Sequence, residues 1–139
     1  MTPPVCVDAS VVVRLLVPAP GSDAVAALWQ QWMAERRRIL APSLLGYEVT
    51  NALRRYEVLG SLTPDEVSDA LDIYRSLGLV HVDDPALHAE ALKLARQHGL
   101  KAAYDAHYVA LARRFGADLY TADARLVQAV GVEPVRLVS

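Results

Sequence analysis

Cysteine and long apolar runs are scarce in this sequence. Its 139 residues include one cysteine, Cys6, which excludes an intrachain disulfide framework and a zinc–thiolate cluster. Because Cys6 lies in an apolar run, we interpret it as a small buried hydrophobic residue. No apolar run is long enough to cross a bilayer, and residues 1–4 lack the basic and apolar regions of a signal peptide. We therefore expect a cytoplasmic protein that has no contact with a membrane.

Net charge is also small, at -2, which excludes a protein that coats nucleic acid through overall positive charge. Arginines gather at residues 36–38, 54–55 and 113–114, where they form either local nucleic-acid contacts or solvated helix ends. The sequence also lacks a glycine-rich phosphate-binding loop. What it does have is 53% hydrophobic residues, no linker and no shift in composition, so we expect one folded domain over residues 1–139.

Helix signals are clearest after residue 62. Thr63, Pro64 and Glu66 form a capping box with proline at the first helical position, and we expect that helix to end at Gly78. The next helix should end at Gly99 in the left-handed conformation. The expected helices cover residues 23–37, 44–59, 63–78, 84–99 and 104–116. For the last of them, the expected core stripe is Tyr104, Tyr108, Leu111, Ala112 and Phe115.

Short apolar runs between these helices are typical of strands. The expected strands are residues 5–7, 38–41, 79–82, 118–121 and 135–138. Strands that alternate with helices predict an α/β fold with a mostly parallel sheet covered by helices on both faces. Ligands bind at the carboxyl ends of the strands in such sheets.

Two aspartates lie just after expected strands. Asp8 comes after the first strand and Asp123 after the fourth, so both should lie at the ligand-binding edge. The alternative for each is that it only caps the next helix.

Two further carboxylates occur in apolar helical stretches. Glu48 shares a face with apolar residues, and burying its charge without a partner would be costly, so we expect a cation or hydrogen-bond donors beside it. Asp105 begins a strongly apolar helix; the alternative there is a favourable interaction with the helix dipole. Four neighbouring carboxylates would raise one another's pKa values. Magnesium, or alternatively manganese, would relieve this conflict and activate a water for phosphodiester hydrolysis.

Four motifs in order resemble those of PIN-domain nucleases, particularly the VapC toxin class. They are Val7-Asp-Ala-Ser10, a glutamate in the following helical region, Tyr104-Asp-Ala-x-Tyr108-x-Ala110-Leu-Ala112 and Leu119-x-Thr121-Ala-Asp123. The resemblance extends from Val5 to about Val138. It implies a three-layer α/β/α sandwich and a metal-dependent endoribonuclease.

The resemblance also implies roles for individual residues. Asp8, Glu48, Asp105 and Asp123 match the acidic catalytic positions of the family. By this match Asp8 and Asp105 are the expected direct metal ligands, whereas Glu48 and Asp123 act partly through water. The expected supporting residues are Ser10, Asn51 and Thr121.

Partners follow from the same resemblance. We expect an RNA substrate, such as a transfer RNA or ribosomal RNA loop, and a VapB-type antitoxin that inserts a basic side chain into the acidic site. We also expect a homodimer, with the surface around Leu28, Trp29 and Trp32 or the helix from Pro64 as candidate interfaces.

Other functions remain open at this point. Asp8 could be the nucleophile of a phosphohydrolase, although the second aspartate typical of the haloacid dehalogenase type is replaced by Ser10. A receiver module would need a lysine and an adjacent acidic pair that are not evident. The domain could also be an inactive binding module. His107 is interpreted as a surface or interface histidine.

Overall fold

Five parallel strands form the centre of the fold in a computed structural model that describes residues 2–131 and 134–138. The strands are β1 (Val5–Val7), β2 (Ile39–Pro42), β3 (Val80–Val82), β4 (Asp118–Thr121) and β5 (Val135–Leu137). They lie in the order β3-β2-β1-β4-β5, and every pairing is parallel. The predicted strand ends are therefore correct to within one residue.

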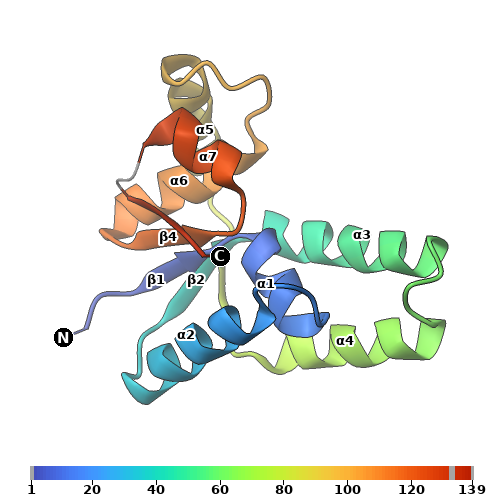
Figure 1. Cartoon of the computed structure of the whole chain (residues 1–139). Coiled ribbons are helices and arrows are strands. Elements are labelled where there is room, and N and C mark those ends of the chain that lie inside the picture. Colours follow the sequence, from blue (N-terminus) through green and yellow to red (C-terminus); the bar gives the residue numbers. More distant parts are fainter. Residues whose placement is uncertain (1, 132–133, 139) are drawn as a thin grey trace.

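Helices cover both faces of this sheet in the described residues. They are α1 (Ala9–Leu16), α2 (Ser22–Ala34), α3 (Leu44–Val58), α4 (Pro64–Ser76), α5 (Ala86–Gln97), α6 (Tyr104–Phe115) and α7 (Ala124–Val130). Figure 1 shows α5, α6 and α7 on one side of the strands and α1 and α2 on the other, while α3 and α4 project away as a pair. The predicted α/β/α architecture is confirmed. None of the described helices is long and apolar enough to span a membrane.

Local signals in the sequence account for several helix ends. The Thr63 hydroxyl accepts a hydrogen bond from the Glu66 amide, and the Glu66 side chain accepts one from the Thr63 amide, which completes the capping box. After α5, Gly99 has φ +63°, a left-handed conformation that glycine adopts at little cost. Both expectations are confirmed.

Two helices, α1 and α7, were not predicted. In α1, three consecutive valines (residues 11–13) are poor helix formers because their branched side chains lose rotamer freedom. Val11 and Val12 are nevertheless fully buried, so packing on the sheet outweighs local propensity. The seven residues of α7 are too few to show a clear periodicity.

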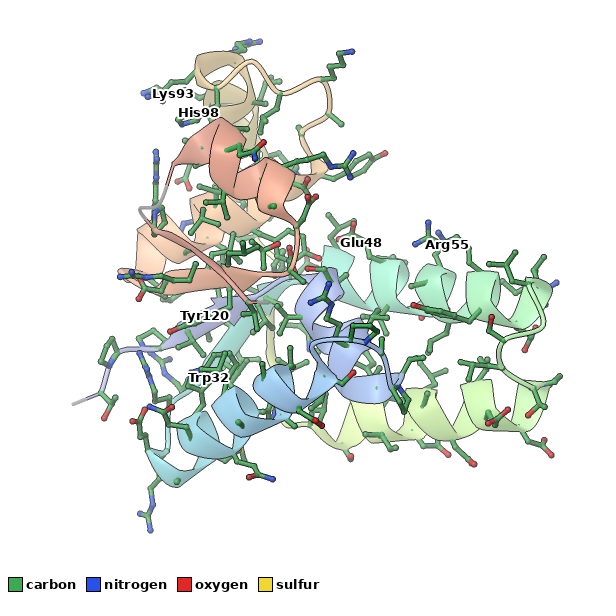
Figure 2. The ribbon with its side chains drawn as sticks, viewed as in Figure 1. Trp32, Glu48, Arg55, Lys93, His98 and Tyr120 are labelled. Atoms are coloured by element: carbon green, nitrogen blue, oxygen red, sulfur yellow. The ribbon has the colours of Figure 1, made fainter. Side chains whose placement is uncertain are left out.

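Some of the expected exposures are wrong. Trp29 and Trp32 are only 6% and 1% exposed, and the Trp32 ring packs edge-on against Tyr120 with centroids 4.8 Å apart (Figure 2). Trp29 and Trp32 are therefore core residues and do not form an exposed dimer interface, while Leu28 is partly buried against the core. Conversely, Tyr104 and Phe115 point outward because α6 packs on the sheet through a neighbouring stripe that includes Ala106 and Val109.

Candidate active site

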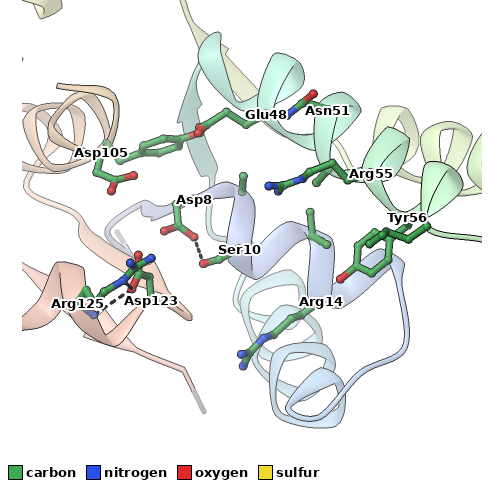
Figure 3. A pocket seen from close by; sticks show the side chains of 15 residues that line it. Asp8, Ser10, Arg14, Glu48, Asn51, Arg55, Tyr56, Asp105, Asp123 and Arg125 are labelled. Carbon is green, nitrogen blue, oxygen red and sulfur yellow. Dashed lines mark hydrogen bonds and ion pairs between the residues drawn. The ribbon is translucent and has the colours of Figure 1, made fainter. Parts of the chain in front are cut away.

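A cavity of about 810 Å³ opens at the carboxyl ends of β1 and β4. From β1 the strand order runs one way to β2 and β3, and the other way to β4 and β5, so the cavity lies at the topological switch point where α/β folds bind ligands. Asp8, Glu48, Asp105 and Asp123 all line it (Figure 3). Four carboxylates that are far apart in the sequence are therefore brought to one pocket.

Asp8 is the most buried of the four, at 6% exposed. Its Oδ1 accepts hydrogen bonds from the Ser10 hydroxyl at 2.5 Å and the Val11 amide at 3.3 Å, and its Oδ2 accepts one from the Thr121 hydroxyl at 2.5 Å. Burial raises the Asp8 pKa from 3.8 to about 6, even though these hydrogen bonds favour the ionised form. The fold thus holds a carboxylate where its charge is unfavourable.

The two hydroxyls beside Asp8 join the ends of β1 and β4. Ser10 Oγ accepts a hydrogen bond from the Ala122 amide at 2.8 Å, and Thr121 Oγ1 accepts one from the Asp123 amide at 3.0 Å. Each hydroxyl accepts from the backbone and donates its single proton to Asp8. Ser10 and Thr121 therefore fix the orientation of the Asp8 carboxylate.

Glu48 is half-buried on α3 and has the hydrogen-bond donor that its burial predicted. The buried Tyr108 hydroxyl on α6 donates to Glu48 Oε1 at 2.5 Å. Burial raises the Glu48 pKa, the Tyr108 hydrogen bond opposes this change, and the charge of Asp105 adds to it. Tyr108 was expected only as a core residue. Its position one helical turn after Asp105 places both on the pocket side of α6 and could have indicated this role.

Asp105 and Asp123 approach the pocket from the first turn of α6 and the start of α7. Burial raises the Asp105 pKa, and the charge of Asp123 raises it further, whereas Arg125 lowers it. Asp123 is the N-cap of α7, where its Oδ1 accepts from the Arg125 amide at 3.0 Å. The Arg125 Nε lies 3.4 Å from the same oxygen.

The donors in this pocket suit a hard cation. They are carboxylate and hydroxyl oxygens. The pKa values of Asp8, Glu48 and Asp105 are raised because burial and neighbouring negative charge destabilise the ionised forms. Within the described residues, no three Asp, Glu, His or Cys side chains are arranged as a closed ligand set. The donors that line the pocket are oxygens, and their chemistry fits a hard divalent cation.

The pocket also includes residues that sequence reasoning did not assign to it. Asn51, an expected supporting residue, lines the cavity, but so do Arg14, Arg55, Tyr56 and Arg125. Spacing could have found two of these arginines, because Arg14 lies four residues after Ser10 and Arg55 four residues after Asn51. Residues four apart share a helix face.

Comparison with known proteins identifies the class to which this fold and pocket belong. Residues 5–132 match the family model described as "PIN domain", and the chain belongs to this family. It is 33% identical over 127 residues to "Ribonuclease VapC3" of Pyrobaculum aerophilum, a match that covers 88% of this chain and 91% of the relative. The similarity to VapC-type PIN-domain proteins that the motifs indicated is thus confirmed.

A solved structure agrees with this assignment. The crystal structure of PAE2754 from Pyrobaculum aerophilum is similar with a TM-score of 0.68 at 30% sequence identity, over 91% of this chain and 79% of that one.

Proposed function

We propose that this protein is a magnesium-dependent endoribonuclease and the toxin of a VapBC-type toxin–antitoxin pair, with residues 1–139 forming a single PIN domain. The observation that carries the proposal is the convergence of Asp8, Glu48, Asp105 and Asp123 on one pocket at the switch point of the sheet. The name of the VapC3 relative, a ribonuclease, supports RNA as the substrate. Its VapC naming likewise supports a VapB-type antitoxin as partner.

In this proposal the four carboxylates have different roles toward the cation. Asp8 and Asp105 hold the cation directly, with manganese as an alternative to magnesium, and Asp123 and Glu48 act partly through water. When bound, the cation offsets charge on the phosphodiester and lowers the pKa of the attacking water. Ser10 and Thr121 hold Asp8 in its acceptor orientation.

Glu48 is the residue best placed to take a proton. Tyr108 occupies its Oε1, which leaves Oε2 to accept a proton from water. The raised pKa of Glu48 brings this carboxylate closer to neutral pH and makes it a stronger base than an ordinary glutamate. Asn51, one turn further along α3, lines the same wall of the pocket and is assigned to positioning.

The residues around Asp8 disfavour the two alternative functions. A phosphohydrolase of the haloacid dehalogenase type would have a second aspartate two residues after Asp8, but this position is Ser10, whose hydroxyl donates a hydrogen bond to Asp8. An inactive binding module would have no need to keep that buried charge, which costs stability.

Cleavage of a structured RNA tests the proposed activity. Wild-type protein should cleave it in magnesium and stop when a chelator is added, and Asp8→Asn and Asp105→Asn should each lose the activity. Asp69→Asn, which removes an exposed carboxylate on α4, is the matched control and should cleave normally. Cleavage that persists in chelator, or in both pocket variants, contradicts the proposal.

Growth tests the proposed toxin role separately. Expression should arrest growth, and co-expression of the neighbouring reading frame should relieve the arrest. Unimpeded growth at a level of expression that yields active nuclease would assign the enzyme to another role.

Size-exclusion chromatography with light scattering tests the proposed homodimer, for which the helix from Pro64 remains the candidate interface.

A further inference from the structure

The pocket has a second end whose chemistry is unlike that of the carboxylates. Between α1 and α3 it is lined by Arg14, Arg55 and Tyr56, with Val13 and Leu59 supplying apolar surface. Figure 3 shows Arg55 extending from α3 toward α1 and the Asp8 side of the pocket, with Tyr56 one step further along α3. One continuous cavity therefore joins an acidic end to a cationic and aromatic end.

Among the residues that the structure describes, Arg14 and Arg55 line this end of the pocket without an acidic partner. Within the described ranges neither forms an ion pair, whereas the adjacent Arg54 pairs with Glu57 on the same helix. Figure 3 shows the two side chains extending in different directions from α1 and α3, so each guanidinium can donate to an anionic group of its own. A phosphate group has the charge and the acceptor oxygens to accept these hydrogen bonds.

Tyr56 provides a stacking surface beside these cations. It is half-buried, so its ring is held in place, and it lines the cavity next to Leu59, which is 78% exposed. Aromatic side chains beside a cationic groove are the usual platform for the bases of single-stranded nucleic acid. An exposed leucine flanking such a ring extends its apolar face.

We propose that this end of the pocket, formed by Arg14, Arg55 and Tyr56, is a subsite for one nucleotide of single-stranded RNA next to the cleaved bond. Arg55 binds its phosphate, Arg14 binds the backbone of the same strand, and its base stacks on Tyr56. The total volume of about 810 Å³ falls in the range of pockets that enclose a small ligand. Bases in a duplex are stacked on one another and cannot enter it. This inference rests on the proposed ribonuclease function and defines how its substrate is held.

Binding of a labelled RNA tests the phosphate contact. The probe is a fluorescein-labelled, single-stranded RNA of mixed sequence, titrated by anisotropy at several salt concentrations, with full-length Asp8→Asn protein as the parent so that the probe stays intact. Adding Arg55→Ala should weaken binding about 10-fold and reduce the slope of log affinity against log salt by about 0.7. Arg54→Ala, the matched control on the same helix, should change neither quantity.

A second probe, with abasic sugars throughout, tests the stacking contact. The parent should bind the abasic strand about 10-fold more weakly than the normal strand. Tyr56→Leu should bind both strands alike, whereas Tyr56→Phe, which keeps the ring, should behave as the parent does. Tyr47→Leu removes an exposed tyrosine of the same helix that does not line the pocket and should retain the full difference.

Several results overturn the subsite. They are equal losses for Arg55→Ala and Arg54→Ala, an abasic penalty that Tyr56→Leu does not change, equal affinity for duplex RNA, and no RNA binding by the parent. A different result contradicts the proposed function. If the wild-type protein binds RNA through these residues but never cleaves it, the subsite is present and the ribonuclease activity is not. Cleavage by wild type together with unaltered binding by Arg55→Ala and Tyr56→Leu removes the subsite alone.

Discussion

The helices that follow β1 and β4 each begin at an aspartate, but the structure surrounds the two aspartates differently. Asp8 and Asp123 are each the N-cap of the following helix. Asp8 is buried and accepts hydrogen bonds from two side-chain hydroxyls. The Asp123 side chain is 32% exposed and lies beside Arg125.

This difference shows that helix capping does not decide which strand-end aspartate carries the chemistry. Either residue could cap its helix with its carboxyl in water, as Asp123 nearly does. Asp8 instead keeps its charge in a buried position that raises its pKa to about 6. A charge held at such a cost in stability is typical of a functional site.

Cleavage rate should show the largest contrast between the two aspartates. Asp8→Asn should lower kcat for RNA cleavage on the order of 10³-fold, because a neutral amide cannot hold the cation or offset its charge. Asp123→Asn should lower it about 10-fold, in line with a contact made through water. Single-turnover rates at saturating magnesium measure both. A larger loss for Asp123→Asn would reverse the ranking.

Stability should change in the opposite direction from activity at Asp8. Because its pKa is raised in the folded state, the folded protein binds a proton more tightly than the unfolded chain does, and its stability falls as pH rises from about 4 through about 6. At pH 8 without divalent cations, Asp8→Asn should therefore increase the free energy of unfolding by roughly 1 to 3 kcal/mol.

Urea unfolding across this pH range measures the effect. The fall should be smaller in Asp8→Asn but not absent, because the pKa values of Glu48 and Asp105 are also raised. Asp69→Asn, on the exposed side of α4, should keep the wild-type pH dependence. A destabilised Asp8→Asn protein at pH 8 would mean that the hydrogen bonds from Ser10 and Thr121 outweigh the cost of burial.

The surroundings of Glu48 are intermediate between those of the two aspartates, because Glu48 is half-buried and accepts a hydrogen bond from one side-chain hydroxyl. Tyr108→Phe removes that donor and should lower kcat about 10-fold with little change in KM, because Glu48 loses its orientation while the substrate contacts remain. Tyr74→Phe is the matched control, because the Tyr74 hydroxyl forms a hydrogen bond with His81 Nε2 at 2.5 Å outside the pocket. Equal kcat values for the two variants would assign Tyr108 to packing alone.

The smallest effect concerns Asp123 as a cap. Asp123→Ala should lower the free energy of unfolding by about 1 kcal/mol, because the Arg125 amide loses its acceptor, and Asp123→Ser should restore most of this loss. Urea unfolding at pH 8 distinguishes the two variants. Equal stability of the alanine and serine variants would show that the cap contributes little to α7.

Much of the fold was predictable because its signals are local. The capping box at Thr63 and the glycine after α5 involve residues within one turn of each other, and both appear as expected. In contrast, α1 forms against the propensity of its valines because the sheet buries them. Which face of α2 would be buried depends on distant partners, and this is why the region of Leu28, Trp29 and Trp32 was a candidate dimer interface.

The site residues also differ in whether local sequence could predict them. Asp8 and Asp123 were predicted because the end of a parallel strand fixes where a side chain lies. The hydrogen bond between Glu48 and Tyr108 joins residues 60 positions apart and depends on how α3 and α6 are placed. Arg14 and Arg55 carried a usable signal, because each lies four residues after a predicted supporting residue, Ser10 or Asn51.

Magnesium-dependent stabilisation tests most directly the claim that a cation compensates the buried charge of Asp8. Thermal unfolding of wild type, Asp8→Asn and Asp69→Asn is followed at pH 8 with and without magnesium. Magnesium should raise the Tm of wild type and Asp69→Asn by several degrees, as expected for a ligand that binds only the folded state, and should leave Asp8→Asn nearly unchanged. An equal rise in all three proteins, or none in wild type, would contradict the account.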